Sequence, residues 1–193
     1  TYARAGLYTV RVVVSDGIVS VSRELNLGVN DADGPGGDPK DFIISKAFIK
    51  LNFSKPKSDT LVLSGTVPIP QGFTPKDKLV VIAIGDYEST FTLDAKGKAV
   101  SGNDSLKLTG KFKKDKKLKK SVYISSPLKF IYTVKKQNLF VKLEDYGFVN
   151  ADVVKPGDSI DLPVIITVDG DSYLNTLTVT YTAKKDKNGV GKK

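Results

Sequence analysis

Apolar and polar residues alternate with a period of two along most of the chain, in runs rich in Val, Ile, Thr, Tyr and Phe. Gly, Pro, Asp and Asn separate these runs. Successive side chains of a β-strand point to opposite faces, so this alternation is typical of half-buried strands. The spacing of three and four residues that marks an amphipathic helix is nearly absent. The pattern therefore predicts an all-β protein.

The clearest unit lies at the start of the chain. Tyr8, Val10, Val12 and Val14 alternate with other residues, Ser15-Asp16-Gly17 follows, and the alternation resumes from Val19 to Val29. Asp-Gly suits a tight hairpin turn because both residues tolerate positive φ angles. We expect a β-hairpin here. A lone hairpin does not bury its apolar face, so residues 7–29 need a further partner.

Residues 30–41 interrupt the alternation. They contain three Gly and two Pro, a composition that supports neither strand nor helix. We expect a linker here and a second domain over residues 42–193. Its strands are predicted near 42–53, 60–67, 79–85, 88–94, 105–113, 120–124, 128–134, 138–143, 160–168 and 173–183. Strands at this spacing favour a β-sandwich.

The second domain also shows an order of features that occurs twice. Residues 75–98 run from Pro75 through an apolar strand, a Gly-Asp turn and an alternating strand to a Lys-rich end, and residues 156–185 repeat that order from Pro156. This predicts an internal duplication of about 48–110 and 128–190, forming one pseudo-symmetric sandwich. The alternative is that two unrelated hairpins look alike.

The composition removes several kinds of chemistry. The chain has no His, Cys, Met or Trp, so it has no imidazole, thiol or disulfide. Paired carboxylates are the remaining catalytic route, and Glu24, Glu88 and Glu144 all lie in sequence that explains them as surface residues. We expect no enzyme. We also expect a piece of a longer protein, because the chain begins at Thr1, and no membrane span, because no apolar run is long enough.

Positive charge is concentrated after residue 41. Residues 1–41 carry a net charge of −2 and residues 42–193 carry +11. The densest run contains Lys111, Lys113, Lys114, Lys116, Lys117, Lys119 and Lys120. It is either a solvated loop or a contact for an anionic polymer such as acidic polysaccharide. Specific nucleic-acid recognition is not expected, because the chain's only arginines are Arg4, Arg11 and Arg23, before the linker.

Other polar residues suggest weaker sites. The linker carboxylates Asp31, Asp33, Asp38 and Asp41 are oxygen donors for Ca²⁺ or belong to a plain spacer, and Asp169 and Asp171 are a second such candidate or a turn. Asn52 and Asn103 fit the glycosylation sequon. Five tyrosines of the second domain form either a sugar-binding platform or half-buried strand residues: Tyr87, Tyr123, Tyr132, Tyr146 and Tyr173.

Residues 6–17, GLYTVRVVVSDG, resemble the closing strands of a PKD-type immunoglobulin-like module. The resemblance covers about the first 30 residues and implies that Thr1 lies inside an incomplete module. It implies Ig-like β-sandwich modules, a partial PKD-like hairpin followed by a larger sandwich, in a secreted or cell-surface protein.

Two functions follow from these features. The favoured one is an extracellular structural or adhesive module that associates with itself or with neighbouring Ig-like modules, as in a filament assembled by strand donation. The alternative is an accessory polysaccharide-binding domain of a secreted hydrolase. Neither requires a cofactor, apart from possible Ca²⁺.

Overall fold

Strands form nearly all of the regular structure. The structure, a computed structural model, describes residues 6–15, 20–29, 40–115 and 120–193. The chain divides into two units, Thr1–Pro39 and Lys40–Lys193. Within the described ranges only two short helical segments interrupt the strands, so the all-β prediction is confirmed. No helix in these ranges is long and apolar enough to cross a membrane.

The first unit contains an antiparallel ribbon of β1 (Gly6–Ser15) and β2 (Ser20–Val29). The register runs unbroken from Gly6 opposite Val29 to Ser15 opposite Ser20. The predicted hairpin is therefore confirmed as a strand pair, while its Asp16-Gly17 turn lies outside the described residues. In the described part of the chain, the sheet holds only these two strands.

The second unit is built on one sheet of eleven strands with a short two-stranded ribbon beside it. The bounds are β3 (Lys40–Asp41), β4 (Ile43–Asn52), β5 (Asp59–Val67), β6 (Leu79–Ile84), β7 (Tyr87–Thr92), β8 (Lys98–Ser101), β9 (Asp104–Thr109), β10 (Phe112–Asp115), β11 (Lys120–Tyr123), β12 (Leu128–Gln137), β13 (Val153–Val168), β14 (Asp171–Lys184) and β15 (Asn188–Lys192), with helices α1 (Phe140–Leu143) and η1 (Glu144–Tyr146).

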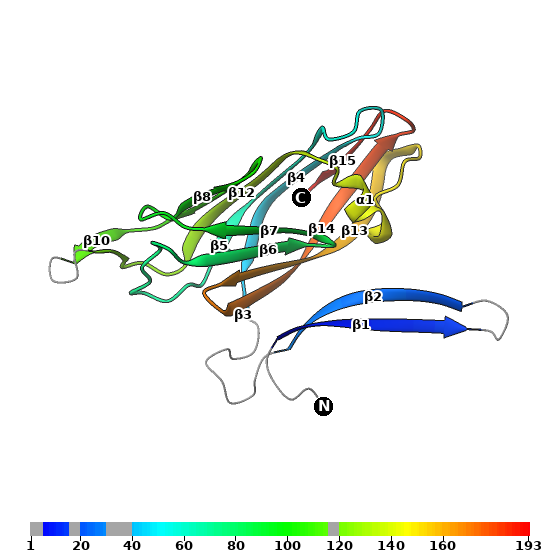
Figure 1. The fold of residues 1–193 in the computed structure, drawn as a ribbon. Helices are drawn as coiled ribbons and strands as arrows, with labels where there is room; N and C mark the ends of the chain where they lie inside the picture. The colour runs from blue at the N-terminus through cyan, green and yellow to red at the C-terminus, as the bar shows by residue number, and fades with distance from the viewer. Residues whose placement is uncertain (1–5, 16–19, 30–39, 116–119) are drawn as a thin grey trace. The chain divides into compact units, whose positions relative to one another are not determined.

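The main sheet folds over a single core. Its strand order is β7-β6-β13-β14-β15-β4-β5-β12-β9-β8, with β3 paired to β14. The end strands β7 and β8 contact each other, and Figure 1 shows β6 and β7 in front of the layer that contains β5 and β12. Inward positions alternate along the strands, as in β5, where Leu61, Leu63 and Val67 are fully buried. Each such side chain stabilises the fold by about 1.5–3 kcal/mol through burial.

The predicted strand at 138–143 is wrong. These residues lead into α1, where Leu139 and Leu143 are four positions apart and both fully buried. That spacing places both side chains on one face of a helical turn. The Asp59 carboxylate, itself buried, fixes the start of the turn by accepting a hydrogen bond from the backbone N–H of Phe140 at 3.0 Å.

Other strand boundaries also differ from the expectation. β8 and β15 were not expected, the run 105–113 divides into β9 and β10, and β13 begins at Val153. Strand propensity does not predict β15, because two of its residues are glycines, which are depleted in strands. A side chain at Gly189 has no space, since an added Cβ would collide with the Tyr181 ring. The close packing against Tyr181, and not strand propensity, therefore explains the glycine in this strand.

The sheet contains two sets of five strands in the same chain order: β4, β5, β6, β7 and β8, then β9, β12, β13, β14 and β15. The pairs β4–β5, β6–β7 and β8–β9 correspond to β9–β12, β13–β14 and β15–β4. Across the middle, β6 pairs with β13 and β5 with β12. Two backbone hydrogen bonds are equivalent under this correspondence of β6 with β13: Gly85 N–H donates to Pro163 O at 3.0 Å, and Asp169 N–H donates to Leu79 O at 2.9 Å. We call these sets the first and second strand sets.

The structure describes only the end of the predicted linker, and its strand sets differ from the predicted duplicated halves. Residues 30–39 of the linker lie outside the described residues, and its last two residues form β3. The strand sets do not coincide with the predicted halves 48–110 and 128–190, and Pro156 lies inside β13 whereas Pro75 precedes β6. Common ancestry of the halves stays a prediction.

Candidate functional site

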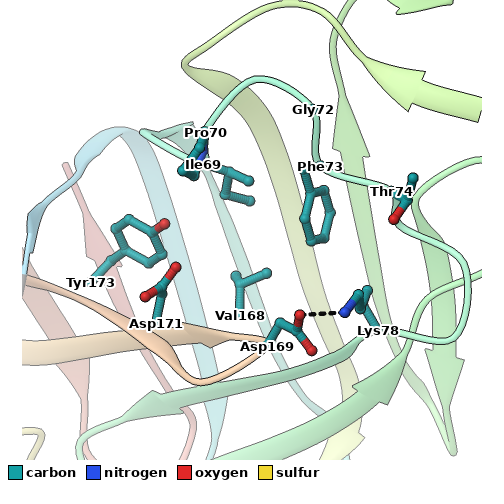
Figure 2. Close-up of a pocket in the computed structure, with 10 residues that line it drawn as sticks. All are labelled: Ile69, Pro70, Gly72, Phe73, Thr74, Lys78, Val168, Asp169, Asp171 and Tyr173. Carbon is teal, nitrogen blue, oxygen red and sulfur yellow. Dashed lines mark hydrogen bonds and ion pairs between the residues drawn. The ribbon is translucent and has the colours of Figure 1, made fainter. Parts of the chain in front are cut away.

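A cavity of about 280 Å³ lies between the 68–78 loop, which joins β5 to β6, and the turn that joins β13 to β14 (Figure 2). Its apolar lining includes Ile69 and Val168, which are 1% and 3% exposed, and the half-buried ring of Phe73. Figure 2 shows Phe73 on one side and Tyr173 with Asp171 on the other. We call this cavity the loop pocket.

The ring of Phe73 is held by the strand behind it. The Phe73 carbonyl accepts a hydrogen bond from the backbone N–H of Tyr123 at 3.0 Å, and Gly72 N–H donates to the Tyr123 carbonyl at 2.8 Å. The Phe73 and Tyr123 rings stack with centroids 6.3 Å apart. Gly72 has a φ of 93°, which an L side chain rarely adopts, so the glycine lets the loop make this bend. The pocket wall is therefore tied to β11.

The rim of the loop pocket carries an ion pair. Lys78 Nζ contacts the carboxylate of Asp169 in the β13–β14 turn, and the two side chains are 35% and 48% exposed. At this exposure the pair contributes little stability, about 0–1 kcal/mol. Its effect on the pocket is to neutralise one of the two nearby carboxylates and leave that of Asp171, which has no hydrogen-bond or ion-pair partner within the described ranges.

Tyr173 supplies the unusual group. Its side chain is fully buried, and its hydroxyl has no hydrogen-bond partner in the described part of the chain. Burial, and secondly the negative charge of Asp171, raise the pKa of Tyr173, so the hydroxyl keeps its proton at neutral pH. A buried hydroxyl without a partner costs about 1–3 kcal/mol. Tyr173 lines the loop pocket, so a bound molecule can remove that cost.

The corresponding place beside the β6–β7 turn is filled. Leu143 is fully buried there, and Tyr146 donates a hydrogen bond to Asp86 Oδ1 at 2.8 Å. A Cβ added to Gly85 would stand 2.8 Å from the Tyr146 ring, so ring and turn are in close contact. The segment containing α1 and η1 thus covers one turn, where the 68–78 loop leaves a cavity at the other.

The polar groups next to the β6–β7 turn are also satisfied. Asp104, 3% exposed, accepts hydrogen bonds from Tyr87 at 2.5 Å and from Ser89 at 2.6 Å. Ser89 also bonds Tyr132, with its hydroxyl 2.8 Å away. Burial, assisted by the bond to Asp104, raises the pKa of Tyr87 to about 12. We call these residues the Asp104 network.

Part of the lysine run lies in the short ribbon β10–β11: Lys113 and Lys114 are in β10 (Figure 1), and Lys111 precedes it. Lys111, Lys113 and Lys114 are exposed, and at the base the Phe112 ring lies 3.8 Å from that of Tyr123, centroid to centroid. Lys120 is in β11, but its side chain is outside the described set. Lys116, Lys117 and Lys119 also lie outside the described residues. Contact with an anionic polymer stays a prediction.

The described linker carboxylate Asp41 and the two sequon asparagines do not form one site. Asp31, Asp33 and Asp38 lie outside the described residues, and Asp41 is exposed in β3. Within the described ranges, no group of three or more His, Cys, Asp or Glu side chains is placed to hold a metal ion. Asn103 is exposed in the β8–β9 turn, whereas Asn52 Oδ1 accepts hydrogen bonds from Ser54 and Lys55. Asn103 is therefore the more accessible sequon.

The tyrosines do not form an exposed platform. Tyr123, Tyr132 and Tyr173 are fully buried, and Tyr87 and Tyr146 are half-buried. Sequence reasoning named Tyr173 but missed Phe73 and Lys78, which come from a distant loop. The Pro and Gly residues of that loop announce a turn, but nothing in its sequence indicates which strand it covers. Comparison with protein-family models, curated proteins and solved structures found no match to this chain.

Proposed function

We propose that the chain is a structural, adhesive module of a larger secreted or surface-anchored protein, and that it associates through the ribbon β1–β2. The observation that carries the proposal is the two-stranded sheet of the first unit, which contains no other strand within the described ranges. Its ten-residue strands present backbone donors and acceptors along both outer edges.

A two-stranded ribbon is at best marginally stable in water. The sequence alternation assigns Tyr8, Val10, Val12 and Val14 to one face, which is apolar and needs cover. Adding the ribbon to an open sheet of a neighbouring module, or to a second ribbon, satisfies both the backbone edge and this face. Self-association or association with Ig-like neighbours is the mode we propose.

The second unit suits a spacer. Its core is continuous over both strand sets, and outward positions of β14 carry the exposed β-branched residues Thr176, Thr178 and Thr180. Such residues favour strands without adding apolar surface. The resemblance of residues 6–17 to PKD-type modules supports the extracellular setting.

The proposal is tested on the full chain by sedimentation velocity over a range of concentrations. Val10→Lys with Val12→Lys places charge on the apolar face, and Thr9→Lys with Val13→Lys places equal charge on the opposite face. We expect the unmodified chain and the second variant to associate, and the first variant to stay monomeric. Monomers at every concentration, or equal effects of both variants, would contradict the proposal.

A further inference from the structure

We propose that the loop pocket binds one ring of a neutral saccharide. This inference goes beyond the structural role and does not depend on it, because it concerns the second unit alone. Three features carry it: a partly open cavity of about 280 Å³, apolar residues in its lining, and Tyr173 among the lining residues, whose buried hydroxyl has no partner within the described ranges. Small-ligand sites commonly combine apolar walls with a few polar groups that fix orientation.

The apolar lining matches the hydrophobic face of a pyranose. The Phe73 ring is half-buried, and its backbone bonds and the Tyr123 stack hold it in place. Ile69 and Val168 complete the apolar part of the lining. The CH groups of a sugar ring pack on such a surface, which leaves the ring hydroxyls for the polar wall.

The polar wall selects hydroxyl groups. The Tyr173 hydroxyl both donates and accepts, whereas the Asp171 carboxylate only accepts. A sugar hydroxyl supplies a donor and an acceptor, so two hydroxyls satisfy both side chains. An ammonium group satisfies Asp171 but offers no acceptor for the Tyr173 proton. An anion is repelled by Asp171, since Lys78 is already paired with Asp169.

The filled place beside the β6–β7 turn shows that the sandwich does not require a cavity here. There Ser89 and Tyr87 have partners in the Asp104 network, and Leu143 and Tyr146 occupy the space. At the loop pocket both the space and the hydroxyl remain. A cavity and an unpaired buried hydroxyl do not stabilise the fold, but both are useful for binding a ligand.

The test titrates the full chain with methyl glycosides of glucose, galactose, mannose and N-acetylglucosamine, with their soluble oligomers, and with methylammonium and glucuronate as charged probes, followed by NMR. We expect saturable binding of at least one. Tyr173→Phe removes only the hydroxyl and should weaken binding about tenfold, the loss of one net hydrogen bond. The unfolding midpoint of this variant should be unchanged or higher, because no bond is lost.

Tyr181→Phe is the matched control on the same strand. Tyr181 is equally buried, but its hydroxyl donates to the Val149 carbonyl at 2.8 Å and it is not in the pocket lining. It should lower the unfolding midpoint and leave binding unchanged. Asp171→Asn should weaken binding with the fold intact. No saturable binding of any neutral sugar, binding only of methylammonium or glucuronate, or equal affinity in Tyr173→Phe would overturn the inference.

Discussion

The two strand sets share one topology but differ in the segments that cross their turns. At the β6–β7 turn, α1 and η1 bring in Leu143 and Tyr146, and the buried Ser89 and Asp104 side chains are hydrogen-bonded to each other. At the β13–β14 turn, the 68–78 loop leaves the loop pocket, and the Tyr173 hydroxyl has no partner among the described residues. Equivalent strands therefore do not imply equivalent sites.

The difference follows from what each connection can supply. A helical turn places residues four apart on one face, so Leu139 and Leu143 both reach the core. The 68–78 loop contains Pro68, Pro70, Gly72 and Pro75, which bend the chain and carry little side-chain volume. One connection fills its end of the sandwich, and the other frames a space.

The largest predicted effect is on the filled end. Leu143→Ala should lower the free energy of unfolding by about 2–5 kcal/mol, because it leaves a cavity in a fully buried position. Phe73→Ala at the other end should cost less, since that ring is half-buried and already borders a cavity. Urea unfolding of both variants followed by circular dichroism measures the difference. Equal losses would show that the ends are packed alike.

The next effect concerns buried polar groups. Asp104→Ala should cost about 1–3 kcal/mol, because the Ser89 and Tyr87 hydroxyls lose their acceptor. Asp171→Ala should change stability by less than about 0.5 kcal/mol, since that carboxylate has no partner within the described ranges. The same unfolding measurement applies. A costly Asp171→Ala would mean that the loop pocket has a structural role.

The turn glycines give a smaller contrast. Gly85 and Gly170 both have positive φ, 53° and 97°, so alanine is strained at either position by about 1 kcal/mol or more. At Gly85 the new Cβ also meets the Tyr146 ring, whereas nothing lies within 4 Å of it at Gly170. Thermal melts should show the larger loss for Gly85→Ala. The reverse order would contradict the close packing of η1 on that turn.

Alkaline pH should loosen the filled end. Tyr87 has a pKa of about 12 in the folded chain, against about 10 when unfolded. A raised folded pKa gives stability that is fully present below pH 10 and is lost as the pH rises toward 12. Unfolding curves across that window should fall less steeply for Tyr87→Phe. Parallel curves would mean that burial and the bond to Asp104 do not raise the pKa of Tyr87 in the folded chain.

The smallest effect compares the β4–β5 turn with the β10–β11 ribbon. Lys113→Gln with Lys114→Gln should weaken heparin binding by about 0.2–1 kcal/mol per exposed charge and so lower the salt concentration that releases the chain. Lys55→Gln with Lys57→Gln, in the exposed turn of the first set, removes the same charge and should matter less. Equal shifts would mean that heparin binding depends on the net charge of the chain and not on the position of these lysines.

Alternation predicted most strands correctly, because a buried face imposes it directly on the sequence. It failed where three-dimensional packing outweighs local preference. At 138–143 a strand-like composition forms a helical turn held by Asp59, and at β15 the Tyr181 ring demands glycine. At the loop pocket, residue type pointed to Tyr173, but not to Phe73 and Lys78, which line the same cavity.

The sequence by itself determined the all-β class, the opening hairpin and the positive charge of the second unit, since these depend on residue type and on spacing within one strand. Only the tertiary structure decided which turn each connection covers and which buried hydroxyl has no partner in the part of the chain that the structure describes. The reason is that a strand's inward face consists of every second residue within one short segment, so the sequence shows it directly. The cavity instead lies between Phe73 and Tyr173, which are far apart in the sequence and come together only through the pairing of the intervening strands.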